Sequence, residues 1–419
     1  MRAPSIWSVA SIAGAAGLVL ATSVCGSQAE PGGSGSGHAS GDGASSSDPK
    51  SDISIDDPRC VDAVDIIASD YAPKGEDWRV TTPEEATPLV NARSITGGIV
   101  FWGHGVDTLP EFPCLESIDT IWVEDTTLTN LSAFGRLAHV TEYFKIARND
   151  RLDDLTGLET LESAGRLSVS SNPGLRSLAG LDSLQKVDGN FSVTSNPDLV
   201  NLAGMPAVEA AVILVSGTIH HLEALANTSA AGYVITSDGS LTSLDGLPVR
   251  SQMDLVNVGG GSFDSLGPLA NLEEVGFLSI GDTTELQSLD GLQNLKLIHG
   301  EDEGNGTLYL AANEKLTDIT ALSNVTIVKT TIEIKNNPLL TSLAGLENVA
   351  STEYLAIRAN SELRDLDPLL NGALESVGQW MRITTNPMLP ECQALSLCAK
   401  YPDAECIVLN NDTDSMDGC

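Results

Sequence analysis

The stretch IEIKNNPLLTSLAGLENV at residues 332–349 decides the fold, because closely similar stretches recur along the chain. LSVSSNPGLRSLAGLDSL at 167–184 and FSVTSNPDLVNLAGMPAV at 191–208 share its pattern of apolar-x-apolar-x-x-Asn-x-x-Leu. A pattern repeated this often at a period of about 23 residues predicts a solenoid with one coil per repeat. The Asn position, or the residue that replaces Asn, falls at Asn149, Asn172, Asn196, Thr218, Asp238, Gly260, Thr283, Asn313, Asn337, Asn360 and Asn386.

Each coil is expected to contain a short strand and a sharp corner. Leu167-Ser168-Val169 alternates apolar and polar residues, which is typical of a strand with Leu167 and Val169 facing inward. Asn172 ends this strand, and Asn tolerates the left-handed backbone angles that a sharp turn needs. Stacked strands predict a parallel sheet, and stacked Asn side chains predict a ladder that satisfies backbone groups at the corner. The expected ladder residues are Asn149, Asn172, Asn196, Asn313, Asn337, Asn360 and Asn386.

The remainder of each coil is expected to supply the core. Leu175, Leu178, Leu181 and Leu184 fill the interior from the other walls, and Gly180-Leu181 marks a second corner. Two looser coils are expected around 99–102 and 121–123. The chain is therefore predicted to be an all-β-rich solenoid of about thirteen coils.

The repeat resembles the strand-and-corner signature of receptor L domains, most clearly at Ile332-Glu333-Ile334-Lys335-Asn336-Asn337 with Leu340. Those domains are ligand-binding β-helical lobes of insulin- and EGF-receptor-type ectodomains, and they also occur in exported bacterial proteins. The resemblance covers residues 95–419 and implies a right-handed β-helix. It overlaps leucine-rich repeats, but the Asn-Pro and Gly-Leu corners favour the L domain. It carries no ligand-contact residue, because those contacts lie outside the repeat motif.

The two ends of the solenoid are expected to be capped, because an open end exposes core and unpaired strand edges. Residues 58–95 are assigned to an N-terminal cap, with a short helix over 60–67 that has acidic residues near its start. Residues 96–390 form the solenoid, either as one rod or as two lobes divided near 212–262. Residues 391–419 are assigned to a disulfide-rich C-terminal cap, and Asn386-Pro387-Met388-Leu389-Pro390-Glu391-Cys392 resembles the last coil and the Cys-closed cap of L-domain proteins.

The N-terminal region indicates export. Residues 1–25 have one Arg and an apolar run, as a signal peptide does. LATSVC at 20–25 resembles a bacterial lipoprotein box, which favours lipidation of Cys25 and outer-membrane attachment, although Val24 departs from the usual pattern. Cleavage after Ala29, which would release the chain, is the alternative. The Gly/Ser-rich residues 26–57 are expected to be a disordered tether.

The cysteines agree with an exported chain. There are seven, and without Cys25 an even number remains, which implies disulfides. The simplest pairing at the N-terminal end is Cys60–Cys114. Three pairings are open for the other four, of which the nested one, Cys392–Cys419 around Cys398–Cys406, is preferred. No Cys or His spacing indicates zinc, and no other metal site is predicted.

The formal net charge of −35 bears on which classes of partner the chain can bind. It argues against nucleic acid and against docking on anionic lipid, so contact with a membrane is expected only through a lipid anchor. Acidic residues at 301–303 and at Asp412, Asp414 and Asp417 would be the ligands of any calcium ion, but ordinary surface loops are favoured and no cofactor is predicted.

The outward strand positions show no catalytic set. Trp122 and Tyr309 are the aromatic candidates for a ligand face, and Trp102 lies nearby. His220-His221 is expected to be a solvated turn rather than a metal site. The positions taken as strand centres are Lys145, Ser168, Ser192, Leu214, Val234, Asp254, Ser279, Tyr309, Glu333, Ala356 and Arg382.

These features favour a non-catalytic cell-surface binding or adhesion module that presents its solenoid to an extracellular protein or glycan. A structural envelope component without a specific ligand is the alternative. A β-helix polysaccharide-active enzyme is less favoured, because such an enzyme needs charged residues that converge on neighbouring coils.

Overall fold

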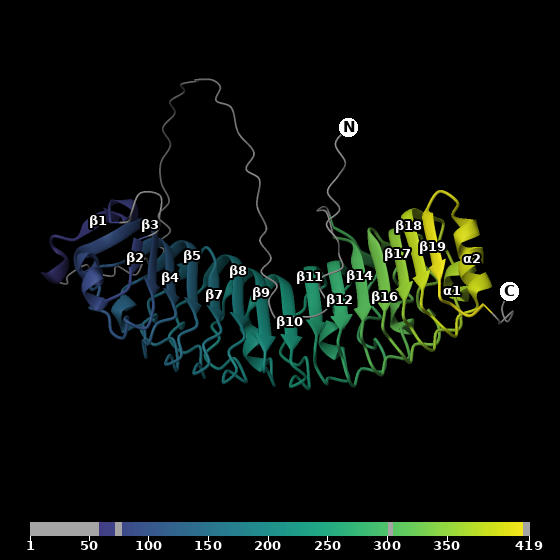
Figure 1. Cartoon of the computed structure of the whole chain (residues 1–419), viewed down its shortest axis with the longest axis horizontal. Coiled ribbons are helices and arrows are strands. Elements are labelled where there is room, and N and C mark those ends of the chain that lie inside the picture. The colour runs from purple at the N-terminus through teal and green to yellow at the C-terminus, as the bar shows by residue number, and fades with distance from the viewer. Residues whose placement is uncertain (1–57, 72–77, 301–304, 414–419) are drawn as a thin grey trace, which may run out of the picture. The chain divides into compact units, whose positions relative to one another are not determined.

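The computed structural model describes residues 58–71, 78–300 and 305–413, all of which belong to one compact unit. The predicted signal peptide, Cys25 and the Gly/Ser-rich tether lie outside the described residues. Within this unit, nineteen strands form one sheet, and neighbouring strands run parallel to one another (Figure 1). Among the described residues, no helix is long and apolar enough to cross a membrane.

Most coils contribute one strand, which pairs with the strands of the coils before and after it. The strands are β1 (Val64–Ile67), β2 (Trp78–Val80), β3 (Ala92–Trp102), β4 (Ser117–Glu124), β5 (His139–Ala147), β6 (Ser163–Ala164), β7 (Leu167–Ser170), β8 (Lys186–Thr194), β9 (Glu209–Gly217), β10 (Ser229–Ser237), β11 (Gln252–Gly259), β12 (Glu274–Gly281), β13 (Leu297–Ile298), β14 (Thr307–Ala311), β15 (Ile327–Val328), β16 (Thr331–Lys335), β17 (Ser351–Arg358), β18 (Ser376–Thr384) and β19 (Glu405–Leu409). Short 3₁₀ turns in the coils are η4 (Ser132–Phe134), η5 (Glu223–Asn227), η6 (Gly267–Leu269) and η7 (Thr320–Leu322).

The inward side chains of neighbouring strands lie in register. Leu167 pairs with Phe191 and Val169 with Val193, so equivalent apolar residues stack from coil to coil. A coil cannot bury its own leucines, but its neighbours bury them, and one apolar core runs from Ile66 to Ala404. Strand pairing continues without interruption through β9, β10, β11 and β12, where two lobes would have divided.

The first corner uses two residues rather than one, which corrects the sequence-based expectation. The left-handed backbone lies at the residue before the Asn, as at Ser171 with φ 56° and Asn336 with φ 54°. The Asn itself is buried, and its side chain turns inward to bond to backbone groups. The sequence pattern placed both tasks on Asn172, because the pattern marks the recurring residue type and not the backbone angle.

Two Asn ladders result. The first runs from Thr126 through Asn149 and Asn172 to Asn196, and the second runs from Thr283 through Asn313, Asn337, Asn360 and Asn386 to Asn411. Each rung is one coil apart, and the Asn residues also donate to a strand carbonyl, as Asn313 does to Ile280. Asn411, absent from the predicted ladder, extends it into the C-terminal region.

The second corner requires glycine. Gly180 has φ 107°, and a Cβ atom there would lie 2.1 Å from the carbonyl oxygen of Leu155 in the preceding coil. Gly345 has φ 114° and the same close approach to Ile319. Both the backbone angle and the space therefore exclude a side chain.

The N-terminal end differs from the predicted helix over 60–67. The chain forms a 3₁₀ turn, η1 (Pro58–Cys60), then strand β1, then η2 (Ala68–Asp70). β1 pairs with β3, and its Ile66 is buried. The sequence Val-Asp-Ile-Ile is rich in β-branched residues, and the open edge of β3 offers hydrogen bonds that an isolated turn of helix cannot match. A 3₁₀ segment, η3 (Pro83–Asn91), then leads into β3, and it begins with a capping box between Thr82 and Glu85.

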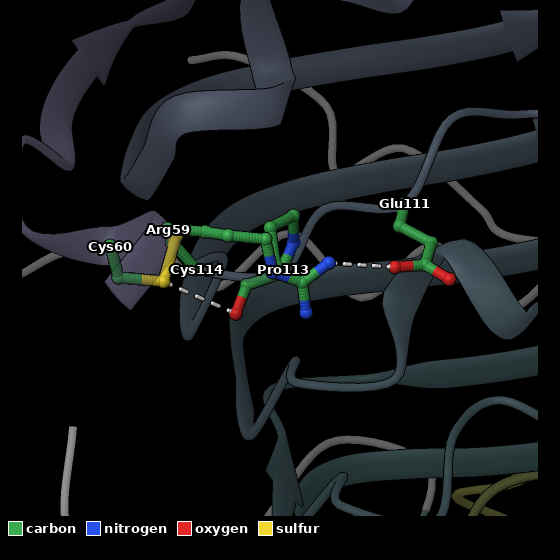
Figure 2. The surroundings of a disulfide bond; sticks show 5 residues. All are labelled: Arg59, Cys60, Glu111, Pro113 and Cys114. Atoms are coloured by element: carbon green, nitrogen blue, oxygen red, sulfur yellow. Dashed lines mark hydrogen bonds and ion pairs between the residues drawn. A yellow bond between two sulfur atoms is a disulfide. The ribbon is translucent and has the colours of Figure 1, made fainter. Parts of the chain in front are cut away.

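Two links hold this end to the first coils. Cys60 is disulfide-bonded to Cys114, with Cα atoms 5.5 Å apart, and Arg59 pairs with Glu111 at 3.0 Å (Figure 2). Both links join the segment at 58–60 to the segment at 111–114. They fix the first residues of the cap although 54 residues separate the two cysteines.

The C-terminal end carries helices α1 (Asp367–Leu370) and α2 (Glu391–Lys400) and the last strand, β19. Cys398 is bonded to Cys406, which joins α2 to β19. Cys392 is also disulfide-bonded, and Cys419, its predicted partner, lies outside the described residues.

Candidate functional site

One side of the sheet faces the core, and the other side, called the open face below, does not. Alternate residues of each strand point to the open face, and strand pairing aligns them in rows. The middle row contains Val100, Trp122, Lys145, Ser168, Ser192, Leu214, Val234, Asn257, Ser279, Tyr309, Glu333, Ala356, Arg382 and Ile407.

The register corrects two sequence-based positions. Asn257, not Asp254, stands in the middle row of β11. Leu255 and Val256 are consecutive apolar residues, so the alternation can be read with either of them facing inward, and the centre chosen from the sequence lies three residues before the observed one. Trp102 pairs with Glu124 in the next row toward the corner, and Val100 takes the middle position in β3.

The first cluster of aromatic and basic side chains lies on β4 and β5 and directly before β7. Trp122 is half-buried and packs edge-on against Tyr143, with ring centroids 6.3 Å apart. Lys145 lies over the Trp122 ring at 5.1 Å, and Arg166 lies over the Tyr143 ring at 5.2 Å. Aromatic rings attract cations through their negative faces, so each ring fixes the position of a positive charge.

A buried carboxylate supports this first cluster. Glu124 is 7% exposed, accepts from Lys145 Nζ at 2.8 Å and is also bonded to Arg148. Arg148 further donates to Asp125 at 2.7 Å, and Trp102 Nε1 donates to the same carboxylate. The hydrogen bond from Arg148 holds the pKa of Asp125 below its usual value and raises the pKa of Arg148.

A similar arrangement lies on β14, β16 and β17. Lys335 lies over the ring of Tyr309 at 4.8 Å and near Glu333 at 3.4 Å, and Arg358 is bonded to Glu333. Tyr309 is only 8% exposed, so it is not the open aromatic anchor that the sequence predicted. Side chains from neighbouring strands, including Lys335, cover it, and the sequence of one coil does not show this.

A third group lies on β17 and β18. Tyr354 and Trp380 contact each other with ring centroids 5.2 Å apart, and the guanidinium of Arg382 lies over Trp380 at 4.8 Å. Both rings are half-buried, whereas Arg382 is exposed. Neither these residues nor Tyr143 and Arg166 were predicted as ligand contacts. Alignment of the coils by their inward residues would have placed the aromatic residues in one outer row.

An apolar patch occupies the centre of the open face. It consists of five half-buried residues on four adjacent strands: Val212, Leu214, Val234, Leu255 and Phe277. Gly232 lies between Val212 and Leu255 in the same row and leaves the patch flat. The central coils therefore carry no charged side chain in the middle row or the rows beside it, where their polar residues are the uncharged Ser216, Thr236, Asn257 and Ser279.

The open face also differs from the chain in charge. We count the middle row and the two rows beside it, which lie two residues before and two residues after the middle position of each strand. In these three rows the basic residues are Arg79, Lys145, Arg166, Lys335, Arg358 and Arg382, and the acidic residues are Glu124, Glu333 and Glu405. Basic residues outnumber acidic ones here, whereas the whole chain carries 57 acidic and 22 basic residues. The acidic residues that give the chain its charge therefore lie mainly off this face.

Two buried side-chain nitrogens of the described residues have no hydrogen-bond partner: Trp122 Nε1 and Arg358 Nε. One belongs to the Trp122 cluster and the other to the Tyr309 cluster. Buried donors are normally satisfied, so both clusters retain donor capacity that their own residues do not use.

The remaining candidates do not form a chemical centre. His220 and His221 are exposed, and His221 lies 3.9 Å from Glu223. In the part of the chain that the structure describes, no three His, Cys, Asp or Glu side chains are grouped to hold a metal ion. Residues 301–303, Asp414 and Asp417 lie outside the described residues. An open groove of about 700 Å³ at the start of β11 and β12 includes Arg250, Asp254, Glu274 and His299.

The arrangement defines a class of protein, a parallel-sheet solenoid with an open, aromatic and basic face. Residues 256–352 match the family model of the receptor L domain. An internalin from Listeria monocytogenes is similar in structure, with a TM-score of 0.41 and 12% identity over 70% of this chain and 74% of that one. TLR13 in its complex with ssRNA13 gives a TM-score of 0.21 and 12% identity over 84% of this chain and 74% of that one. No curated protein matches the chain.

Proposed function

We propose that this protein is a non-catalytic binding or adhesion module of the cell surface, which presents its open face to an extracellular protein or glycan. The observation that carries the proposal is the concentration of aromatic and basic side chains on one face of a strongly acidic chain. Trp, Tyr and Arg are the residues that most often dominate binding energy at interfaces. The match of residues 256–352 to a domain described as a receptor domain supports the same function.

Attachment to the cell envelope is part of the proposal. The apolar N-terminus, Cys25 in a lipoprotein-like box and the Gly/Ser-rich residues after it favour a lipid-anchored outer-membrane protein that faces outward. Disulfides at Cys60–Cys114 and Cys398–Cys406 support an oxidising compartment. Release into the medium is the outcome expected if Cys25 is not acylated.

A structural envelope component is the second candidate. The plain serines at Ser168 and Ser192, in the middle row of β7 and β8, are the observation that favours it. A structural role alone does not account for the cations stacked on aromatic rings, Lys145 on β5 and Arg382 on β18. Binding is therefore the preferred function.

The proposal is tested by capture of surface proteins and glycans from intact cells with the whole chain as bait. Val234→Arg places a long, charged side chain in the centre of the open face. Val200→Arg is the matched control, because Val200 is exposed on the wall beyond the first corner and the change in charge is the same. Loss of a ligand with Val234→Arg but not with Val200→Arg supports the proposal. Equal capture by both variants, or no ligand above an acidic control protein, contradicts it.

A further inference from the structure

Two exposed arginines and the apolar patch between them indicate what kind of partner the open face binds. Arg166 and Arg382 are exposed guanidinium groups, each stacked on an aromatic ring, and among the described residues neither has a carboxylate partner. The apolar patch of Val212, Leu214, Val234, Leu255 and Phe277 lies between them. An interface with a stable apolar core and a polar rim has this arrangement.

Arg166 and Arg382 differ from Lys145, Lys335 and Arg358, which lie on the same face. Lys145, Lys335 and Arg358 each form an ion pair with Glu124 or Glu333, so part of their charge is already compensated within the protein. Arg166 and Arg382 keep their planar donor groups free, and stacking on Tyr143 and Trp380 restricts their rotation. A guanidinium held in this way binds a carboxylate through two parallel hydrogen bonds at a reduced entropic cost.

The distance between the arginines sets the size of the partner. Nine strand-to-strand steps separate β7 from β18. At about 4.8 Å per step this gives about 43 Å, and the three rows are about 16 Å wide. The area is therefore about 700 Å², close to the roughly 800 Å² that each partner buries in a standard protein interface.

A protein fits the surface better than a glycan does. The central patch offers few hydrogen-bond groups, so a sugar chain that crossed it would leave hydroxyl groups unsatisfied. Moreover, the rings of Tyr143 and Trp380 are covered by the protein's own arginines and do not provide free stacking platforms. A partner protein with an apolar surface buries no unpaired polar group at the centre. Asp or Glu residues on either side of that surface would pair with the arginines at both ends.

We infer that the open face binds a protein whose contact surface is apolar at its centre and carries carboxylates at both ends, with Arg166 and Arg382 as the carboxylate anchors. This inference rests on the proposed binding function and specifies the partner. Acidic ends on the partner also explain why the anchors are basic on a chain with a net charge of −35.

A peptide library tests the inference while the natural partner is unidentified. Random 20-residue peptides displayed on yeast are selected against the whole chain, since an extended 20-mer of about 66 Å spans both arginines. The expected consensus has apolar residues flanked by Asp or Glu. The Arg166→Gln/Arg382→Gln variant is expected to weaken binding of the selected peptides at least tenfold. The matched control is Arg176→Gln/Arg364→Gln, which makes the same charge change at exposed arginines paired off the open face.

Two further variants and one glycan test the separate parts of the inference. Arg166→Lys/Arg382→Lys retains the charge but not the planar group, and it is expected to recover only part of the affinity. Leu214→Ser is expected to weaken binding through the apolar centre. Binders without acidic residues, or equal binding by wild type and Arg166→Gln/Arg382→Gln, overturn the inference. Binding of alginate, a uronate polymer, that depends on the two arginines also overturns it in favour of a glycan.

Failure of this inference is distinguishable from failure of the proposed function. If the peptides bind elsewhere while Val234→Arg still abolishes capture from cells, the binding function stands and the partner chemistry is wrong. If neither experiment gives a ligand on the open face, both are wrong.

Discussion

Asn313 donates through Nδ2 to the side-chain oxygen of Asn337 at 3.0 Å, and the backbone nitrogen of Asn313 donates to the same oxygen at 3.2 Å. One side-chain oxygen thus satisfies two buried donors of the preceding coil. Asn337 also donates to the carbonyl of Leu310 and to Asn360, so it connects neighbouring coils in both directions. The ladder replaces, at the corner, the backbone pairing that ends with the strands.

Asn337→Ala is expected to lower the free energy of unfolding by about 3 kcal/mol, because it leaves several fully buried polar groups without partners. Urea unfolding of the purified chain measures the change. Asn348→Ala is the control, since Asn348 is exposed and its side chain makes one hydrogen bond within the described residues, to the carbonyl of Ser323. A loss below about 1 kcal/mol for Asn337→Ala would mean that water replaces the ladder at little cost.

Ala359→Gly is expected to stabilise the protein. Ala359 has φ 55°, in the left-handed region where a Cβ atom costs about 1 kcal/mol, and glycine removes that cost. The gain is partly offset by the greater entropy of glycine in the unfolded chain. We expect a net gain of a few tenths of a kcal/mol, measured as a higher urea midpoint. Ala350→Gly, at a partly exposed position without positive φ, is expected to destabilise. A loss of stability with Ala359→Gly would show that the corner is not strained.

The two described disulfides are expected to differ in their contribution. Cys60–Cys114 closes a separation of 54 residues and Cys398–Cys406 one of 8. Loop-closure entropy then gives about 4 kcal/mol for the first and about 2.5 kcal/mol for the second. Double Cys→Ser variants, compared by urea unfolding, measure both. A larger loss from the Cys398–Cys406 pair would show that native-state contacts, rather than chain entropy, dominate.

Asp125→Asn is expected to change how stability depends on pH. The hydrogen bond from Arg148 lowers the pKa of Asp125 in the folded state, so the folded state binds fewer protons than the unfolded state. The stabilisation is therefore present above the unfolded pKa and is lost as the pH falls through the folded pKa. Because both side chains are partly exposed, we expect less than about 1 kcal/mol at pH 7.

Urea unfolding at pH 7 and at pH 2.5 measures this effect. Wild type should exceed Asp125→Asn at pH 7 and approach it at pH 2.5. Asp150→Asn is the control, because the Asp150 carboxylate is exposed and forms no ion pair within the described residues. A pH-independent difference between wild type and Asp125→Asn would mean that the amide changes packing instead of the charge interaction.

The repeat made the strands and the second corner predictable from the sequence. Leucines and the Gly-Leu pairs recur because every coil must bury its neighbours and turn at the same place. The sequence did not identify β1, because four β-branched and acidic residues fit a helix or a strand, and only the edge of β3 favours the strand. It also missed Asn411, because Asp412 and Asp414 occupy the positions where the repeat has Pro and Leu.

The candidate site was less predictable than the fold. Trp122 lies on the open face, but the burial of Tyr309 depends on side chains from neighbouring coils. The stacked pairs of Arg166 with Tyr143 and of Arg382 with Trp380 join residues that lie 20 or more positions apart or share a strand, and no local pattern marks them. Such pairs follow from the register between coils, which the sequence leaves ambiguous where two apolar residues are adjacent, as in β11.

The most direct test of the account places a photo-crosslinking amino acid at Val234, in the centre of the open face, and separately at Val200, on another wall of the solenoid. Each protein is incubated with intact cells that supply the ligand and is then irradiated, and the crosslinked products are compared. We predict a discrete product with the label at Val234 that is absent with the label at Val200 and decreases in Arg166→Gln/Arg382→Gln. A product from Val200 alone, or equal products from both positions, would contradict the assignment of the open face as the binding surface.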